Sequence, residues 1–294
     1  MRKQDEFEGT RGKQRKKGMS GNKILIIVLA LVLLAGAGGG VGFYLYNSEQ
    51  KSKAAAEDAK KADPDKAQEQ YDKMKSTVSV DADDPMLRKI DFTAAQAENP
   101  DVYAWIWIPG TNVDYPILRS ESEDDAYYLN HTIDGLEGLP GTIYTEKYNA
   151  KDFTDPVTII YGHNMKNGSM FADLHKYEDK EFFDNNPYIY IYLPDQTLRF
   201  RVFAAVTFDD RYLMGNYNFF FPEDFQRYLD ELRSSIDGNV NTEVNVTQET
   251  GIITLSTCIG DSPSQRWMVN DGRISRIPTK DIKAYMALIY NHTK

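Results

Sequence analysis

The sequence predicts a mostly β fold, an eight-stranded β-barrel with peripheral helices, preceded by one N-terminal transmembrane helix. Eight short runs of strand-forming residues recur between residues 104 and 270. Helical periodicity is confined to a few short segments. Many short strands with few helices are typical of closed or nearly closed barrels. In addition, an uncharged run of 23 residues, 24–46, lies ahead of all of these segments.

The apolar run at residues 24–46 predicts a transmembrane anchor. At 1.5 Å per residue a helix of this length crosses a hydrocarbon core of roughly 30 Å. Residues 1–23 carry eight Lys and Arg against three Asp and Glu, a net charge of +5. The positive-inside rule therefore predicts a cytoplasmic tail and an extracellular C-terminal bulk at the cell membrane. The alternative is a cleaved signal peptide, because Ala35-Gly36-Ala37 is an A-x-A pattern, although the apolar run continues to Tyr46.

The charge balance excludes some partners. The chain carries −10 overall, so the part after residue 23 carries −15. A nucleic-acid partner would require a basic face, and we expect none. The four histidines are scattered and no acidic cluster has a calcium-loop spacing, so we expect neither a metal nor another cofactor.

Residues 47–85 predict an extracellular stalk or linker. They are rich in Lys, Ala, Glu, Asp and Gln and almost free of large apolar residues, as in a helical or disordered spacer. Asp63-Pro64-Asp65 is expected to interrupt any helix there. The folded domain then covers residues 86–294, which is enough for one core.

The domain opens with a short amphipathic helix that ends at Asn99-Pro100. Strands are predicted at 104–108, 113–118, 141–145, 157–163, 188–193, 198–208, 251–258 and 266–270. The runs VTIIY and GIITL are continuously apolar, as in strands buried on both faces, whereas LRFRV alternates. Further helices are predicted at 169–177, at 222–236 behind Pro222, and at the C-terminus from Thr279.

Cys258, the only cysteine, closes the predicted strand 251–258. A lone extracellular thiol is either buried and inert or used in chemistry. As a nucleophile it needs a nearby base or cation, because its ordinary pKa leaves little thiolate at neutral pH. His163, at the end of strand 157–163, is the best placed of the histidines. His131 is expected in a loop, His175 on a helix facing solvent, and His292 at the terminus.

Arg266 lies eight residues beyond the cysteine. The intervening IGDSPSQ is rich in turn-forming residues, so a hairpin centred on Ser262 is predicted. Such a hairpin places Cys258 and Arg266 on adjacent antiparallel strands with Cα atoms about 4.5–5.5 Å apart. A guanidinium there can favour the thiolate and can hold an oxyanion.

These residues carry a resemblance to a known family. TLSTC, the step of eight residues to Arg266 and the upstream His163 resemble the signature of sortases, the cysteine transpeptidases of Gram-positive bacteria. The string YGHNMKNGSMF and the helix 222–236 ahead of the cysteine strand resemble class B sortases in particular. The resemblance covers residues 86–294 and implies an eight-stranded barrel for this catalytic domain.

The resemblance also implies a reaction. Cys258 would attack a sorting motif near the C-terminus of a secreted protein, a motif beginning Asn-Pro in class B. His163 would act as acid and base, and Arg266 would bind substrate or the oxyanion. An amine of the peptidoglycan precursor would resolve the acyl-enzyme. Ser256 and Thr257 either line the pocket or pack as ordinary strand residues, and Asn164 is expected to shape the substrate-binding rim around His163.

Three other functions stay open at this point. A wall-associated cysteine peptidase would use the same Cys-His pair with water as the acceptor. A pilin-polymerising sortase would use a lysine acceptor. A tethered adhesion or scaffold domain would carry an inert cysteine, which alkylation at neutral pH would reveal.

Overall fold

The computed structural model describes residues 61–260, 262–282, 284 and 285, which belong to one folded unit. The predicted cytoplasmic tail and the predicted anchor at residues 24–46 lie outside the described residues. Among the helices that are described, none is long and apolar enough to cross a bilayer. The anchor therefore stays a prediction.

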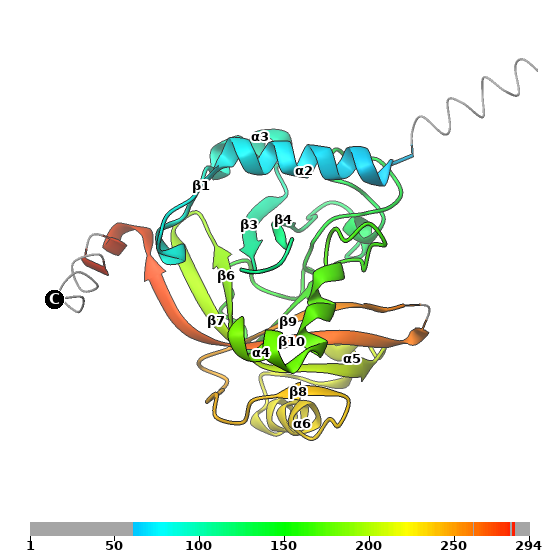
Figure 1. Cartoon of the computed structure of the whole chain (residues 1–294), viewed down its shortest axis with the longest axis vertical. Coiled ribbons are helices and arrows are strands. Elements are labelled where there is room, and N and C mark those ends of the chain that lie inside the picture. The colour runs from blue at the N-terminus through cyan, green and yellow to red at the C-terminus, as the bar shows by residue number, and fades with distance from the viewer. Residues whose placement is uncertain (1–60, 261, 283, 286–294) are drawn as a thin grey trace, which may run out of the picture. The chain divides into compact units, whose positions relative to one another are not determined.

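The centre of the fold is one eight-stranded sheet in the order β4-β3-β6-β7-β10-β9-β5, with β8 paired to β7 (Figure 1). The strands are β3 (Val102–Trp107), β4 (Asp114–Leu118), β5 (Val157–Tyr161), β6 (Tyr188–Tyr192), β7 (Gln196–Asp209), β8 (Gly238–Val240), β9 (Ile252–Ile259) and β10 (Ser262–Pro278). Every pairing is antiparallel except that of β5 with β9. The mostly β prediction is confirmed, and β8 is a strand that the sequence did not predict.

The predicted strand at 141–145 is wrong in detail. Only Tyr144 makes β-bridges, one to Leu118 at the end of β4 and one to Tyr161 at the end of β5. β4 and β5 are the two edge strands of the sheet, so a single residue joins them. The sheet is therefore a half-barrel rather than the closed or nearly closed barrel that eight predicted strands suggested. Gly141 at φ +62° turns the chain at the start of the predicted strand.

The helices are α2 (Pro64–Val78), α3 (Phe92–Glu98), α4 (Lys180–Asn185), α5 (Leu213–Asn216) and α6 (Pro222–Arg233), with 3₁₀ helices η1 (Pro85–Leu87), η2 (Tyr127–Leu129), η3 (Ala172–Glu178) and η4 (Thr279–Asp281). A small ribbon of β1 (Ser79–Val80) and β2 (Lys89–Ile90) interrupts the predicted opening helix. The helix predicted at 222–236 is confirmed as α6, with Pro222 in its first turn. Most of the predicted C-terminal helix lies outside the described residues.

α2 corrects the predicted boundary of the domain. Asp63 caps this helix by accepting hydrogen bonds from the amides of Asp65 and Lys66, and Pro64 occupies its first turn, where no N–H donor is needed. The segment Asp63-Pro64-Asp65 thus starts a helix instead of interrupting one. The helix buries Ala67, Tyr71, Met74 and Val78. These residues, spaced four, three and four apart, form an apolar stripe, so the folded domain begins well before residue 86.

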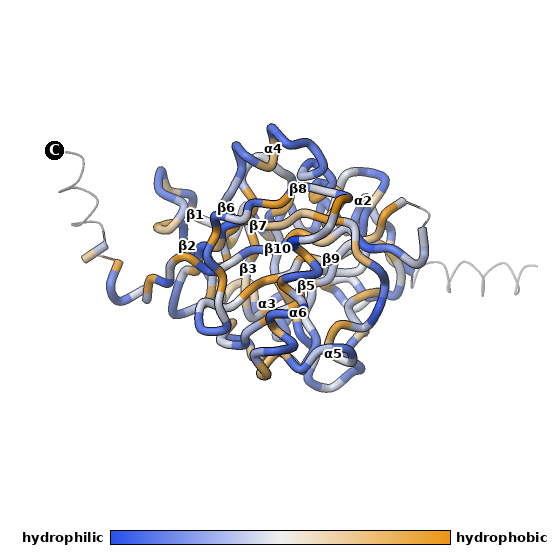
Figure 2. Tube along the Cα trace, turned by 90° about the horizontal axis from the view of Figure 1, so that it is seen from below, coloured by the Kyte–Doolittle hydropathy of each residue, from blue (hydrophilic) through white to orange (hydrophobic). Residues whose placement is uncertain are grey.

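Two hydrophobic clusters lie on opposite faces of the sheet. Along β9, Ile253 and Leu255 pack with residues of α2 and α3, whereas Ile252 packs with residues of α6. This alternation follows from the period of two in a strand, and it explains why GIITL is continuously apolar. Figure 1 places α2 with α3 on one side and α6 on the other. In Figure 2 hydrophobic stretches follow the central strands.

Asp271 on β10 yields a stability prediction. Its side chain is completely buried, and within the described part of the chain neither carboxylate oxygen has a hydrogen-bond partner. Burial raises the pKa of this carboxyl well above its ordinary value. We expect Asp271→Val to increase the free energy of unfolding at pH 7 by about 1–3 kcal/mol, the cost of an unsatisfied buried polar group.

The pH dependence of this gain has a definite sign. A carboxyl whose folded pKa is raised contributes stability below its unfolded pKa, near 3.9, and loses it as pH rises. Urea unfolding should therefore find a larger advantage of the valine variant at pH 7 than at pH 4. If the valine variant were less stable than wild type at both pH values, the Asp271 carboxyl would not be an unpaired buried group.

Candidate active site

Strand register brings His163 and Cys258 to the same end of the sheet. β5 and β9 run parallel, with Tyr161 paired to Ser256, and the Gly162 amide extends the ladder to the Ser256 carbonyl at 3.2 Å. His163 lies two residues beyond Tyr161, and Cys258 lies two residues beyond Ser256. Because side chains alternate along a strand, both leave on the face that Tyr161 and Ser256 already occupy.

Arg266 comes to the same place from β10. The predicted pairing is confirmed, because Arg266 pairs directly with Cys258 across the β9–β10 ladder. The turn is not centred on Ser262, since Ser262 pairs with Ile259 and the register shifts between Ser262 and Arg266. Directly paired residues project from the same face. One guanidinium nitrogen, Nη1, donates to the carbonyls of Pro263 at 3.0 Å and Gln265 at 2.9 Å. The hairpin itself therefore fixes the direction of the guanidinium beside the thiol.

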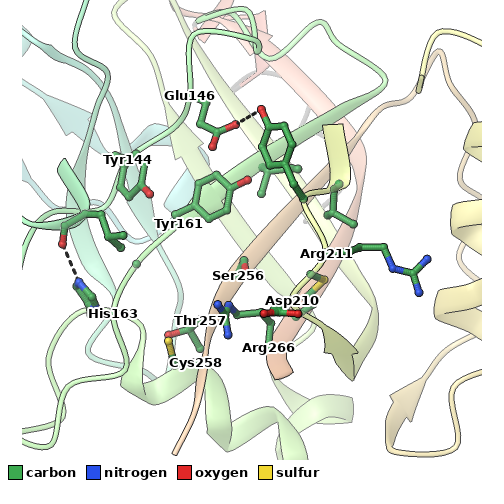
Figure 3. Close-up of a pocket in the computed structure, with 16 residues that line it drawn as sticks. Tyr144, Glu146, Tyr161, His163, Asp210, Arg211, Ser256, Thr257, Cys258 and Arg266 are labelled. Carbon is green, nitrogen blue, oxygen red and sulfur yellow. Dashed lines mark hydrogen bonds between the residues drawn. The ribbon is translucent and has the colours of Figure 1, made fainter. Parts of the chain in front are cut away.

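The three side chains line one cavity of about 310 Å³. The cavity opens between the ends of β5, β9 and β10 and the segment that follows β7 (Figure 3). Its other lining residues are Leu129, Tyr144, Glu146, Ile159, Tyr161, Gly162, Asp210, Arg211, Tyr212, Leu213, Ser256, Thr257 and Met268. Cys258 is half-buried with a free thiol at one end. The arrangement presents a nucleophile, a base and a cation around one open cavity.

His163 is held in one orientation by the backbone. Its Nε2 lies 2.7 Å from the carbonyl oxygen of Leu129, as the dashed line in Figure 3 marks. A carbonyl only accepts hydrogen bonds, so Nε2 carries hydrogen in this arrangement. Nδ1 is the nitrogen left to take up or release a proton. The described contacts include no hydrogen bond between this ring and the thiol of Cys258, although both side chains line the cavity.

Two of the three predicted substrate-binding residues line the cavity. Ser256 and Thr257 are buried and both contribute to the wall of the cavity. The hydroxyl of Thr257 is buried and has no hydrogen-bond partner among the described residues. Asn164 does not line the cavity. Its side-chain amide donates to the backbone carbonyl of Cys258 at 3.1 Å, and its role at the substrate rim stays a prediction.

The expectation that His175 faces solvent is wrong. Its side chain is only 23% exposed and does not simply face solvent. The ring stacks on Trp267 of β10, and Nε2 lies 3.0 Å from the carbonyl oxygen of Cys258. The segment is a 3₁₀ helix that buries Leu174 and Tyr177. An interpretation with three residues per turn would have put His175 beside that apolar stripe.

Glu146 and Tyr212 lie at the other end of the cavity, and no sequence pattern pointed to either of them. The Tyr212 hydroxyl donates to the Glu146 carboxylate at 2.9 Å, as drawn in Figure 3. Burial raises the pKa of Glu146. Burial together with the hydrogen bond to Glu146 raises the pKa of Tyr212 to about 12. The end of the cavity away from Cys258 is thus polar, with Glu146 partly buried and Tyr212 exposed.

Glu146 gives a second pH-dependent prediction. Its folded pKa is raised above its ordinary 4.5. The stability it contributes is therefore complete below that value and is lost as pH rises. Glu146→Gln, which does not titrate, should gain in Tm relative to wild type between pH 4 and pH 7.

Glu121 serves as the control of opposite sign. Hydrogen bonds from Lys151 and Arg119 lower its pKa to about 2. Glu121→Gln should therefore lose Tm relative to wild type over the same pH range. If both variants shifted in the same direction with pH, the assigned environment of Glu146 would be refuted.

Comparison with protein families and known proteins gives a consistent answer. The sortase domain family matches residues 106–271, which include every strand from β4 to β9 and most of β10. Sortase B of Listeria monocytogenes is 39% identical over 167 residues, 55% of this chain and 65% of that protein. Sortase B of Staphylococcus aureus is 31% identical over 170 residues, 57% of this chain and 67% of that protein. The chain therefore spans slightly less than two thirds of the Listeria relative's length.

Solved structures agree with the sequence comparison. Clostridium perfringens sortase B superposes with a TM-score of 0.55 at 28% identity, over 63% of this chain and all of that one. A sortase B described as complexed with triglycine superposes with a TM-score of 0.56 at 28% identity, over 63% of this chain and 85% of that one. The chain belongs to the sortase family of cysteine transpeptidases, and among sortases to class B.

Proposed function

We propose that this sortase is a membrane-anchored transpeptidase that joins secreted proteins to an amine of the cell-wall precursor. The observation that carries the proposal is the register of three neighbouring strands. β5, β9 and β10 deliver His163, Cys258 and Arg266 to one cavity. A thiol, a base and a directed cation are the groups that acyl transfer through a thioester requires.

Each residue has a defined step in this reaction. The thiol proton of Cys258 passes to Nδ1 of His163, and the thiolate attacks the carbonyl carbon of the sorting motif. The guanidinium of Arg266 stabilises the oxyanion that forms. When the C–N bond breaks, His163 gives its proton to the leaving amine, and a thioester remains on Cys258. An incoming amine then loses a proton to His163, attacks the thioester and releases the thiol.

Membership of class B supports a proposal for the sorting motif and for the acceptor amine. Class B resemblance favours a sorting motif that begins Asn-Pro. The sortase B described as complexed with triglycine supports a glycine-type amine as the acceptor. The cavity of about 310 Å³ is large enough for several side chains of an extended peptide but not for a folded segment.

Product analysis tests the function and separates its alternatives. The full chain would be incubated with a peptide containing an Asn-Pro motif, with and without triglycine. We expect the cleaved peptide to appear joined to triglycine when the amine is present. Cleavage with water as the acceptor at an undiminished rate would favour a peptidase, and transfer only to a lysine side chain would favour a pilin polymerase.

The location is a separate prediction. We expect residues 47–294 to lie outside the cell and to stay membrane-bound through residues 24–46, because a net +5 tail precedes 23 uncharged residues. Protease treatment of intact protoplasts should remove the domain. Release of the domain into the medium with a new N-terminus after Ala37 would favour the signal peptide instead.

A further inference from the structure

The carbonyl of Cys258 lies where the β-ladder ends. On β9, carbonyls alternate in direction, so the Cys258 carbonyl points to the same edge as the Ser256 carbonyl. Ser256 still receives a backbone donor, the Gly162 amide at 3.2 Å, although β5 itself has ended at Tyr161. The Cys258 carbonyl, two residues further on, is contacted by side chains and not by a backbone amide of β5.

Two side chains reach this carbonyl. Nδ2 of Asn164 lies 3.1 Å from the Cys258 oxygen, and Nε2 of His175 lies 3.0 Å from it. The two nitrogens are 3.0 Å from each other. On its far side, Nδ1 of His175 lies 2.6 Å from a carboxylate oxygen of Glu178, one 3₁₀ turn along η3.

Hydrogen-bond accounting leaves two states of the ring. The Glu178 carboxylate and the Cys258 carbonyl are both acceptors, so the ring donates to both only as an imidazolium with two N–H groups, and in that state its Nε2–H faces the Nδ2 donor of Asn164 at 3.0 Å. A neutral ring that donates to Glu178 turns a lone pair toward the Cys258 oxygen. Nε2 then accepts from Asn164, and the carbonyl keeps one donor in place of two.

The position of the ring is independently fixed. It stacks on Trp267 with centroids 5.9 Å apart and an interplanar angle of 21°. The Trp267 indole N–H donates to the Leu174 carbonyl at 2.8 Å, which ties η3 to β10. Among the described contacts of the ring, Glu178 is the charged group, Cys258 carries the thiol, and Asn164 and Trp267 are neutral. η3 is therefore a rigid support for the peptide group that follows the nucleophile.

We propose that His175, charged and paired with Glu178, is a positioning residue for Cys258. The Cys258 carbonyl and the Ile259 N–H belong to one planar peptide group, so a fixed carbonyl also fixes that N–H and the Cα that bears the thiol. Protonation of His175 adds a second hydrogen bond to this peptide. The proposal rests on the proposed function for its kinetic consequence, but its structural content is independent of activity.

The chain offers a direct structural readout, because it contains a single cysteine. Labelling cysteine with ¹³C at the carbonyl gives one resonance, which reports the hydrogen bonding of this carbonyl alone. In the full-length wild type we expect this resonance to shift as pH rises and His175 loses its proton. In His175→Phe, which keeps an aromatic ring against Trp267, and in His175→Gln that step should vanish. The control Lys176→Ala, whose side chain pairs with Asp173, should keep it.

Kinetics provide the second readout. Loss of one hydrogen bond from a charged donor should lower kcat of His175→Phe about 10- to 100-fold with KM changed little. His175→Gln retains a donor and should recover most of kcat, and its ratio to wild type should rise with pH because glutamine does not titrate. In a His175→Gln background, Glu178→Gln should have no further effect.

The two proposals fail in different ways. An inactive wild type whose carbonyl resonance shows the His175-dependent step would refute the proposed function and support the positioning role. An active wild type whose resonance titrates identically in His175→Phe, with kcat unchanged, would overturn the positioning role and leave the proposed function intact.

Discussion

Cys258→Ala is expected to abolish cleavage and transfer of a sorting peptide, with a loss of at least about 10⁴-fold in kcat/KM, as for other covalent nucleophiles. The thiol is the only one in the chain, and it lies at one end of the cavity, beside Arg266. Steady-state cleavage of a peptide with an Asn-Pro motif is the measurement.

The fold of this variant should survive. The thiol is half-buried and small, so its removal should change the free energy of unfolding by no more than about 1 kcal/mol. Ser264→Ala, at the exposed tip of the same hairpin, is the matched control and should keep full activity. Cleavage by the alanine variant at the wild-type rate would show that another group is the nucleophile.

Arg266→Lys is expected to be nearly as damaging as Arg266→Ala, and both should lose about 10²–10³ in kcat/KM, the typical effect of one oxyanion donor. The guanidinium is aimed by two carbonyls of its own hairpin, Pro263 and Gln265, through a single nitrogen. Its remaining N–H groups then project in fixed directions. A lysine ammonium is a mobile, strongly hydrated point charge and cannot reproduce that geometry.

Kinetics of both variants on one peptide distinguish direction from charge. If Arg266 only lowered the pKa of the thiol by its charge, lysine would restore most of the activity. A lysine variant within a few-fold of wild type would therefore exclude the directional role. Arg211→Lys is the control, because Arg211 also lines the cavity but pairs with Asp209 and Glu231 at a partly exposed site. We expect this variant to remain within a few-fold of wild type.

The sequence predicted the hairpin and the buried strands because those features depend on local pattern. Cys258 and Arg266 are joined by a short segment rich in turn formers, so antiparallel pairing of the two flanking strands could be expected. His163 could be placed at a strand end from the apolar run before it. That His163 lies near Cys258 could not be predicted in the same way. It depends on the parallel pairing of β5 with β9, which no local pattern specifies.

The errors arose where tertiary contacts overrule local composition. α2 is mostly polar, and its four buried residues become an apolar stripe only when a sheet lies beneath them. His175 becomes part of the site because Trp267 and Cys258 approach from distant strands. Glu146 and Tyr212 are 66 residues apart and meet only across the finished cavity. The spacing of the buried residues of α2 is a helical signal that its polar composition obscured, whereas the contact between Glu146 and Tyr212 leaves no periodic signal in the chain.

Intact-protein mass spectrometry after mixing with a sorting peptide tests most directly whether Cys258 forms a thioester that an amine resolves. On wild type we expect one acyl adduct with the mass of the N-terminal peptide fragment. The adduct should be absent from Cys258→Ala, and it should disappear when triglycine is added, as the ligated peptide forms. An adduct that forms equally on Cys258→Ala, or one that triglycine never releases, would contradict covalent transfer through this thiol.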